Sequence, residues 1–157
     1  MAVETLRPNA AGDECNIMKE AGAACPNHYQ NVDESSADDD TTKVYSNQTS
    51  YERDLYNITD HSVGSGTINK ITVYARANDT YTGDPVRASL KICIKSGTGS
   101  GAPDTVSESN EITVSHTWTT YSNEWSTNPA TGSAWTWDEI DKLQIGCALQ
   151  YGYWYTQ

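Results

Sequence analysis

Hydrophobic and polar residues alternate with a period of two along much of the chain. In the segment 87–95, four aliphatic side chains share one side: Ala88, Leu90, Ile92 and Ile94. The residues between them are polar or small, as expected for a strand with one buried face. The same alternation recurs in 67–77, 111–115 and 143–149, and Gly, Pro, Asn and Asp separate these segments. About eight to ten short strands of this kind predict an all-β fold, an antiparallel β-sandwich or jelly roll.

One short helix is predicted near the C-terminus. Thr117–Ser126 is rich in Thr, Tyr and Trp and indicates a strand, which Pro129 and Gly132 then end. Thr136 and Glu139 have the spacing of a capping box. Trp135 and Ile140, which flank this box, have the spacing of a hydrophobic staple. Since two-residue alternation resumes at Leu143, the helix must fit between residues 136 and 142.

The overall composition limits the classes of protein that this chain can belong to. A length of 157 residues is that of a single domain, and no apolar run approaches the roughly 20 residues that span a bilayer. The net charge of -11 argues against nucleic acid and anionic membranes as main partners. Phe is absent, whereas there are 5 Trp and 10 Tyr, so these rings must supply the aromatic part of the core.

No signal peptide is visible at the N-terminus, which has neither a basic nor an apolar region. The Thr-, Ser- and Tyr-rich composition is nevertheless typical of proteins that work outside the cell, and release by lysis would reconcile the two. At the other end, 151–157 is still strand-like. Either the last strand ends there, or the true C-terminus extends beyond Gln157.

Residues 1–30 lack clear alternation, and we predict a loosely structured N-terminal arm on a single domain that spans 1–157. The arm contains Cys15 and Cys25, whose separation permits a disulfide that would stabilise the fold by about 2–3 kcal/mol. Two alternatives stay open: Cys93 bonds one of them, or all four cysteines are reduced. No two cysteines have the close spacing typical of zinc ligands.

The sequence contains no recognisable catalytic motif. The three histidines, His28, His61 and His116, are far apart and lack ligand spacing, and no Gly-x-Ser-x-Gly elbow occurs. The glycine-rich segment 97–101 follows a strand, but no helix follows it to bind phosphate. We therefore expect a protein that is not an enzyme and needs no cofactor.

Two groups of residues are candidates for ligand binding. In the acidic segment 33–40, Asp38, Asp39 and Asp40 could supply oxygen ligands for structural Ca²⁺, although the spacing is not that of a known calcium loop and a charge run is usually a solvated surface. Aromatic side chains could form a glycan platform or a partner contact: Tyr121, Trp125, Tyr151, Tyr153 and Trp154. The alternative is that these rings fill a core without Phe.

Several segments together resemble jelly-roll virion accessory proteins of tailed phages. The N-terminal part of this likeness is Leu6-Arg-Pro-Asn-Ala10, Tyr29-x-Asn-Val-Asp-Glu34 and Asp38-Asp-Asp-Thr-Thr42. The C-terminal part is Gly66-Thr-Ile-Asn-x-Ile-Thr-Val-Tyr74, Trp118-Thr-Thr-Tyr-Ser122 and Trp135-Thr-Trp-Asp-Glu-Ile-Asp-x-Leu-Gln-Ile-Gly146. The family includes head decoration proteins and tail appendages, and its sandwich is similar to carbohydrate-binding modules.

The resemblance implies a non-enzymatic protein on the virion surface, first of all a capsid decoration protein on the outer head. Its partners would be the major capsid protein or another virion protein, in a homo-oligomer or an assembly of many copies, and the arm 1–30 would be the contact segment. Two alternatives remain: a glycan-binding module of a tail appendage or an extracellular sandwich, and a fibre-forming subunit joined by strand exchange.

Overall fold

The computed structural model describes residues 3–63, 65–80 and 87–151. This part of the chain is mostly β-structure in antiparallel sheets, with one short α-helix, as predicted. The strands are β1 (Pro8–Cys15), β2 (Lys19–Ala21), β3 (Lys43–Tyr45), β4 (Glu52–Ile58), β5 (Ile71–Ala77), β6 (Ser89–Ser96), β7 (Thr105–Glu108), β8 (Ile112–Thr113), β9 (Thr119–Trp125) and β10 (Gln144–Gln150). The helices are the 3₁₀ helix η1 (Asn27–Asn31) and α1 (Trp137–Ile140). Neither helix is long and apolar enough to cross a membrane.

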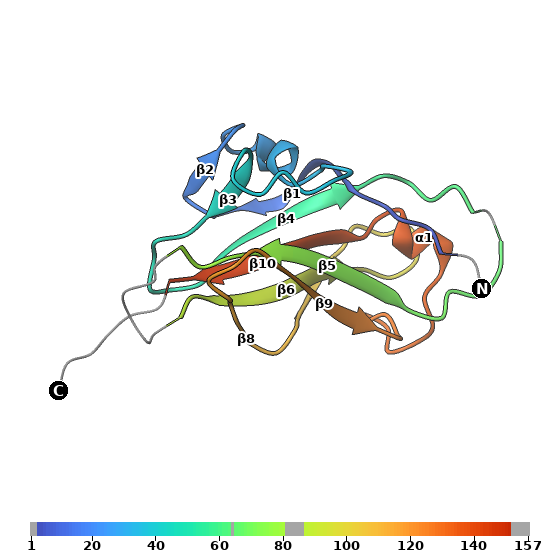
Figure 1. The fold of residues 1–157 in the computed structure, drawn as a ribbon. Coiled ribbons are helices and arrows are strands. Elements are labelled where there is room, and N and C mark those ends of the chain that lie inside the picture. The colour runs from blue at the N-terminus through green and yellow to red at the C-terminus, as the bar shows by residue number, and fades with distance from the viewer. Residues whose placement is uncertain (1–2, 64, 81–86, 152–157) are drawn as a thin grey trace.

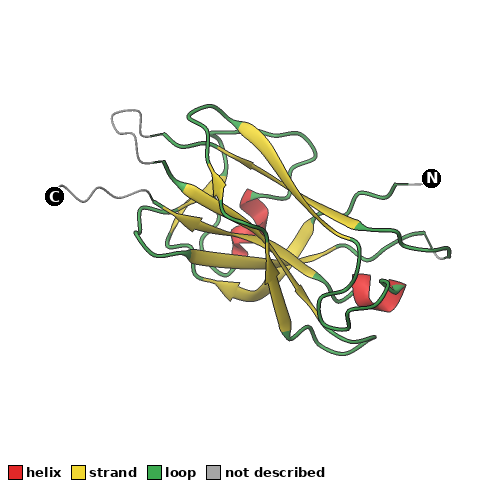
Figure 2. Cartoon of the chain, turned by 90° about the horizontal axis from the view of Figure 1, so that it is seen from below, coloured by secondary structure: helices red, strands yellow, loops and turns green. Residues whose placement is uncertain are grey.

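The largest sheet has six strands in the order β1-β4-β10-β6-β7, and β8 also pairs with β6. Two separate parts of the chain cover different regions of one face of this sheet, which we call its inner face (Figures 1 and 2). The two-stranded sheet β5–β9 packs over β6 and β7, and η1 packs against β1 at the other end. We call β2, β3, η1 and the loop 32–42 the N-terminal lobe. Strand β10 therefore lies between the parts covered by the lobe and by β5–β9.

The main core forms where β5–β9 covers the six-stranded sheet. Alternation in β6 is confirmed, since Leu90, Ile92 and Ile94 are almost fully buried there. Trp125 and Trp135 join the same core. Each of these rings satisfies its polar nitrogen: Trp125 Nε1 donates to Ser107 Oγ at 3.0 Å, and Trp135 Nε1 donates to the Trp125 carbonyl at 3.1 Å. Burial of the large rings thus leaves no unpaired donor in either side chain.

The predicted helix start is also confirmed. Thr136 and Glu139 form the capping box, and the Thr136 backbone N–H donates to Glu139 Oε2 at 2.9 Å. Trp135 and Ile140, the two residues of the predicted staple, are both buried in the main core. The α-helix is a single turn, because Leu143 and the following residues return to the sheet.

The predicted loose arm at residues 1–30 is wrong. Residues 8–15 form β1, an edge strand that pairs with β4, and 27–31 form η1. Strand β1 is held by contacts that no local pattern reveals. Asn57 Nδ2 donates to the Ala11 carbonyl at 2.6 Å, and Gln144 Oε1 accepts the Asp13 N–H at 3.0 Å. At Gly12, a Cβ would lie only 2.4 Å from the Leu55 carbonyl oxygen.

Candidate docking site

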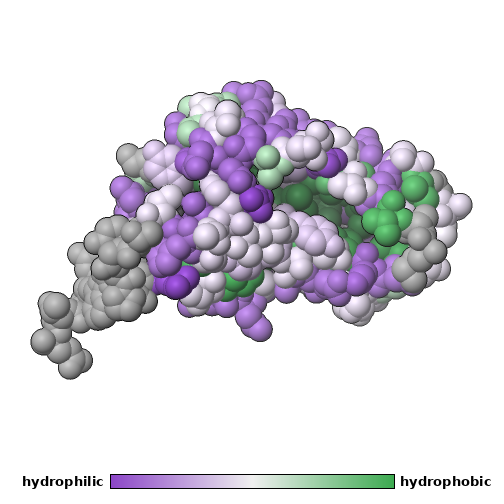
Figure 3. Space-filling view, in the orientation of Figure 1, coloured by the Kyte–Doolittle hydropathy of each residue, from purple (hydrophilic) through white to green (hydrophobic). Residues whose placement is uncertain are grey.

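A strip of the inner face above β10 is not covered by a strand in the described parts of the chain. Figure 3 shows a recess there, lined by hydrophobic residues, between the N-terminal lobe and the layer that contains β5. Strand β5 packs over β6, and β10 is the next strand of the larger sheet in the direction of the lobe. A strand added to the free side of β5 would lie about 4.8 Å from it. We call this recess the β10 groove.

The floor of the β10 groove is apolar. Ile145, Cys147 and Leu149 on β10 face inward and belong to the main core, yet they are only half-buried. Ile92 and Ile94, their neighbours on β6, have no exposed surface. Burial, followed by the nearby Cys93 and Asp54, raises the pKa of the Cys147 thiol, which therefore remains neutral and apolar at physiological pH. These half-buried side chains would gain cover from an added strand.

One wall of the groove is the free edge of β5. Every residue of β5 pairs with β9, and no other described strand pairs with it. Its alternate backbone N–H and C=O groups therefore face the groove, where they could pair with an extended chain. Tyr74 on the outer surface of β5 is 69% exposed. A free edge beside an apolar floor is the geometry that strand addition requires.

An ion pair closes one end of the groove. Arg76 at the end of β5 donates to both carboxylate oxygens of Asp39 in the lobe, at 2.5 and 2.9 Å. The guanidinium also lies over the Trp118 ring, 6.0 Å from its centroid. Asp39 has a positive φ of 53°, a conformation that is unusual for a residue other than glycine. The bridge thus links the lobe to the end of β5.

The three predicted calcium ligands do not converge. Asp39 binds Arg76, whereas Asp40 binds Lys43 Nζ at 2.7 Å. Asp38 Oδ2 instead accepts the Thr42 hydroxyl at 2.8 Å. Hydrogen bonds from Arg76 and Lys43 hold the pKa of Asp39 and Asp40, respectively, below the usual value. Each carboxylate thus already has its own partner, and the loop does not form a shared oxygen cage.

The structure places three of the five residues of the predicted aromatic platform: Tyr121, Trp125 and Tyr151. Trp125 is buried, and Tyr121 is half-buried with its hydroxyl accepting the Ser115 N–H at 2.8 Å. Tyr151 is half-buried, and its N–H donates to the Gln48 carbonyl at 2.7 Å. Tyr153 and Trp154 lie outside the described residues. The rings of Tyr121 and Trp125 therefore serve the core rather than a sugar-binding surface.

Basic side chains on the outer face of the six-stranded sheet are paired within the molecule. Arg53 binds Glu14 and Glu108, Lys91 binds Glu108, and Lys95 binds Asp13. Cys93 lies fully buried on this face between Lys91 and Lys95, and burial raises its pKa to about 12. These ion pairs join three basic and three acidic side chains, so they contribute nothing to the net negative charge of the protein.

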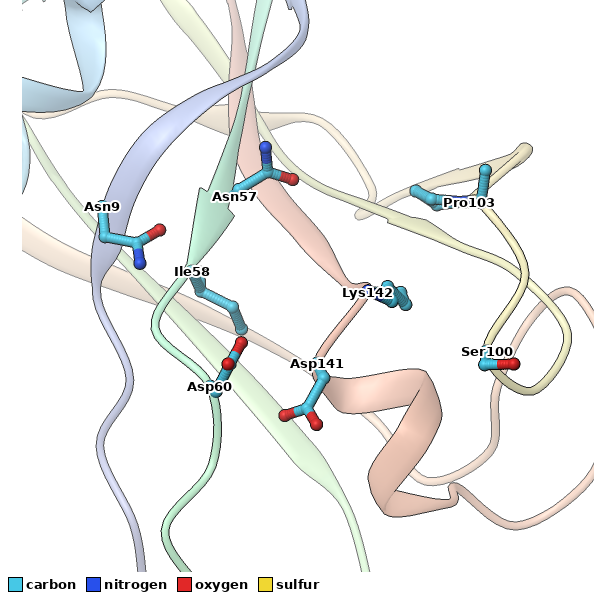
Figure 4. A pocket seen from close by; sticks show the side chains of 9 residues that line it. Asn9, Asn57, Ile58, Asp60, Ser100, Pro103, Asp141 and Lys142 are labelled. Carbon is cyan, nitrogen blue, oxygen red and sulfur yellow. The ribbon is translucent and has the colours of Figure 1, made fainter.

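A second hollow, of about 510 Å³, opens at the end of the six-stranded sheet near α1 (Figure 4). It lies between the start of β1, the end of β4, the loop 100–103 and residues 141–142. Asp141 is already bound there, because its Oδ1 lies 2.6 Å from His61 Nδ1 and accepts the His61 N–H at 3.1 Å. Burial opposes ionisation of Asp141, but these bonds prevail and lower its pKa. His61 also stacks on Trp137, with centroids 4.8 Å apart.

A buried polar cluster anchors the N-terminal lobe. Asp54 on β4 has no exposed surface, and its Oδ1 accepts the Ile17 N–H at 2.9 Å. Its Oδ2 lies 2.6 Å from His28 Nδ1 and accepts the Tyr56 hydroxyl at 3.1 Å. Cys15 Sγ lies 3.4 Å from the same His28 nitrogen, and Cys15 forms a disulfide with Cys25. Burial raises the pKa of Tyr56 far above its usual value, so this hydroxyl stays a donor.

Sequence reasoning did not find this cluster, because its members come from three separate segments and show no motif. The available signal was an Asp at an inward position of a strand, since a charged residue there must have buried partners.

No protein-family model matches the chain, and no curated protein or solved structure is significantly similar to it.

Proposed function

We propose that this protein is a non-enzymatic structural protein that binds a larger assembly by accepting an extended segment of a partner in the β10 groove. The observation that carries the proposal is the strip above β10 that no described strand covers, with the free edge of β5 beside it. The added strand would extend the β5–β9 sheet to three strands and complete a jelly-roll sandwich. The assembly that we propose is the outer head of a tailed phage, on which this chain is a decoration protein.

The groove also defines the chemistry of the partner segment. Backbone pairing with β5 requires an extended chain, and alternate side chains of that chain would point down onto Ile145 and Cys147. The side chains at those positions should be apolar and small to medium in size, because they must fit between the added strand and the floor of the groove. The positions between them face solvent beside an acidic protein with net charge -11, which favours Lys or Arg there. A flexible, basic segment of a capsid protein has this chemistry.

The virion location has separate support from the charge and from the family resemblance. An acidic protein is repelled by packaged DNA, so the outer surface suits it better than the inner one. A single strand buries less surface than the roughly 1,600 Å² of a standard interface. Attachment through many copies on a repeating lattice compensates for weak single contacts.

The first test is to find the chain in purified particles. Virions from the phage whose genome encodes the chain should be banded by density, and the copy number should be measured by quantitative mass spectrometry against the major capsid protein. We expect a fixed ratio to the capsid protein that reflects the symmetry of the head. Absence from intact virions would contradict the decoration function.

The second test addresses the groove itself. The double substitution Thr72→Lys and Tyr74→Lys places charges on the free β5 edge, which opposes strand addition. The matched control carries Thr120→Lys and Ser122→Lys on β9, where the two residues lie directly opposite Arg76 and Tyr74. We expect the β5 variant to lose at least about tenfold in affinity for particles stripped of this protein, a loss of about 1.4 kcal/mol. Equal binding by both variants would contradict docking along β5.

A fibre subunit remains the second candidate, because the same groove could accept a strand from another copy. In that case the purified protein should form concentration-dependent oligomers without any partner. Sedimentation velocity distinguishes the two, since strand exchange gives oligomers that grow with concentration, whereas a decoration protein should keep one size until capsids are added. The β5 variant should then also abolish oligomers, whereas the β9 control should keep them.

A further inference from the structure

Three side chains with the chemistry of zinc ligands meet beneath the N-terminal lobe, and a fourth, Cys25, is bonded to one of them. The ligand atoms of Cys15, His28 and Asp54 all lie within 4.8 Å of one another, and Cys25 is bonded to Cys15. His28 is 1% exposed and Asp54 is fully buried, whereas Cys25 is exposed. The site is therefore rigid at its base and open to solvent at one ligand, through which an ion could enter.

Of the two distances from His28 Nδ1 to its neighbouring ligand atoms, one already matches a tetrahedral zinc site and the other is shorter. With ordinary zinc–ligand bonds, sulfur and nitrogen ligands lie about 3.5 Å apart, and nitrogen and oxygen ligands about 3.3 Å. Cys15 Sγ and His28 Nδ1 are already 3.4 Å apart. His28 Nδ1 and Asp54 Oδ2 are 2.6 Å apart, because a proton lies between them. Replacing that proton with a metal ion requires these two groups to separate by less than about 1 Å.

The second nitrogen of His28 provides independent support. Nε2 is buried and has no hydrogen-bond partner in the described structure, and the nearest carboxylate oxygen, Glu20 Oε2, is 3.6 Å away. A metal on Nδ1 would shift the ring proton to Nε2, where Glu20 could accept it. A carboxylate behind a ligating histidine is the usual arrangement at zinc sites, since it orients the ring and fixes its tautomer. The nitrogen without a partner thus gains one when metal binds.

We propose that Cys15, Cys25, His28 and Asp54 form a redox-dependent zinc site. In the oxidised protein the Cys15–Cys25 disulfide removes both sulfur ligands. A thiol reductant transfers two electrons and two protons to the disulfide, which yields two Cys thiols and the oxidised reductant. Zinc then displaces one proton from each thiol and one from His28 Nδ1, and these protons leave to solvent. His28 Nε2 takes up one proton from solvent, so zinc binding releases two protons in total. The chain would carry zinc in a reducing cell interior and a disulfide outside it.

The site can be tested with cobalt(II) as a spectroscopic probe for zinc. The full chain is reduced with a phosphine, which is then removed under anaerobic conditions before titration with cobalt. We expect one equivalent to give thiolate-to-cobalt charge-transfer absorption and tetrahedral visible bands, which one equivalent of zinc then abolishes. The oxidised protein should show neither band. It should also have two reactive thiols under denaturing conditions, Cys93 and Cys147, and the reduced protein four.

Two variants make the assignment specific. Cys25→Ser removes the exposed ligand and should weaken zinc binding at least about tenfold in competition with a chromogenic chelator. His61→Asn is the matched control, because it breaks the other His–Asp pair of 2.6 Å, which has no cysteine beside it. It should leave affinity unchanged. Equal affinity in Cys25→Ser and wild type, or cobalt bands in the oxidised protein, would overturn the proposal. Loss of the fold on reduction that zinc does not restore would also overturn it.

Discussion

The two coverings of the six-stranded sheet are built in different ways. Where β5–β9 covers β6 and β7, contact is made by aliphatic and Trp side chains, and Ile92 and Ile94 lose all exposure. Where the N-terminal lobe meets β1 and β4, the fully buried groups at the contact include Asp54, which binds Ile17 and His28. One covering is therefore held by apolar area, and the other by a few directed hydrogen bonds and a disulfide.

The two halves of the protein should therefore respond differently to mutation. Apolar contacts are numerous and non-directional, so they tolerate small shifts and fail together. A buried carboxylate is held by specific donors, and removal of one partner leaves the others desolvated and unpaired. The lobe should thus separate from the sheet as a local unit, while the β5–β9 half should unfold only with the whole domain.

Asp54→Ala is expected to have the largest effect. It removes the acceptor of three hydrogen bonds and leaves His28, Tyr56 and the Ile17 N–H without their partner, which should cost about 3–5 kcal/mol. Denaturant unfolding measures this loss, and hydrogen exchange locates it. We expect amides of η1, β2 and β3 to lose protection while β6 and β10 keep theirs.

The comparison variant for this experiment is Ile92→Ala in the other half. It leaves a cavity under β5–β9 and should cost about 2–5 kcal/mol, with protection reduced evenly across the whole sheet. Two variants with similar stability loss would then differ in where exchange increases. If Asp54→Ala also loosened β6 and β10, the lobe would not be an independent unit.

Gly12→Ala is expected to have an intermediate effect. A Cβ at this position would lie 2.4 Å from the Leu55 carbonyl oxygen and 2.9 Å from Gln144 Oε1, so β1 would have to move away from β4. Such overpacking should cost about 1–3 kcal/mol in thermal or denaturant unfolding. Ala10→Ser, two residues earlier on the same strand, should change stability by less than about 0.5 kcal/mol. A neutral Gly12→Ala would mean that β1 does not pack closely on β4.

The same contrast explains what sequence analysis could and could not predict. Strands β5, β6 and β10 and the capping box at Thr136 follow from local sequence patterns, which are preserved because the burial there is apolar. Trp125 was a candidate for a glycan platform, whereas it is buried in the core. Strand β1 does not follow from a local pattern, since its residues Ala10 to Gly12 have low β-propensity and depend on Asn57 and Gln144 from distant strands. The cluster at Asp54 was missed for the same reason, as its residues meet only in the fold.

The smallest expected effect concerns the charged contact that joins β1 to β6 across the outer face. Lys95 Nζ donates to Asp13 Oδ2 at 2.6 Å, and hydrogen bonds from Lys95 and then Gln144 lower the pKa of Asp13 despite its partial burial. A carboxyl group whose pKa is lower in the folded state stabilises the fold above its unfolded pKa of about 3.9, and this contribution disappears as pH falls through the folded value. Because Asp13 is about half exposed, screening limits the contribution at pH 7 to about 0.5 kcal/mol or less.

Asp13→Asn should therefore be slightly less stable than wild type at pH 7, and the difference should shrink toward pH 2 as Asp13 takes up a proton. Denaturant unfolding at both pH values, combined with Lys95→Gln in a double-mutant cycle, isolates the contribution of the pair. Added salt should reduce it at pH 7, since the pair is exposed to solvent. A stability difference that grows toward low pH would reverse the sign and contradict this account. A coupling of several kcal/mol would mean that surface charge, and not the buried Asp54, holds β1 and the N-terminal lobe to the rest of the sheet.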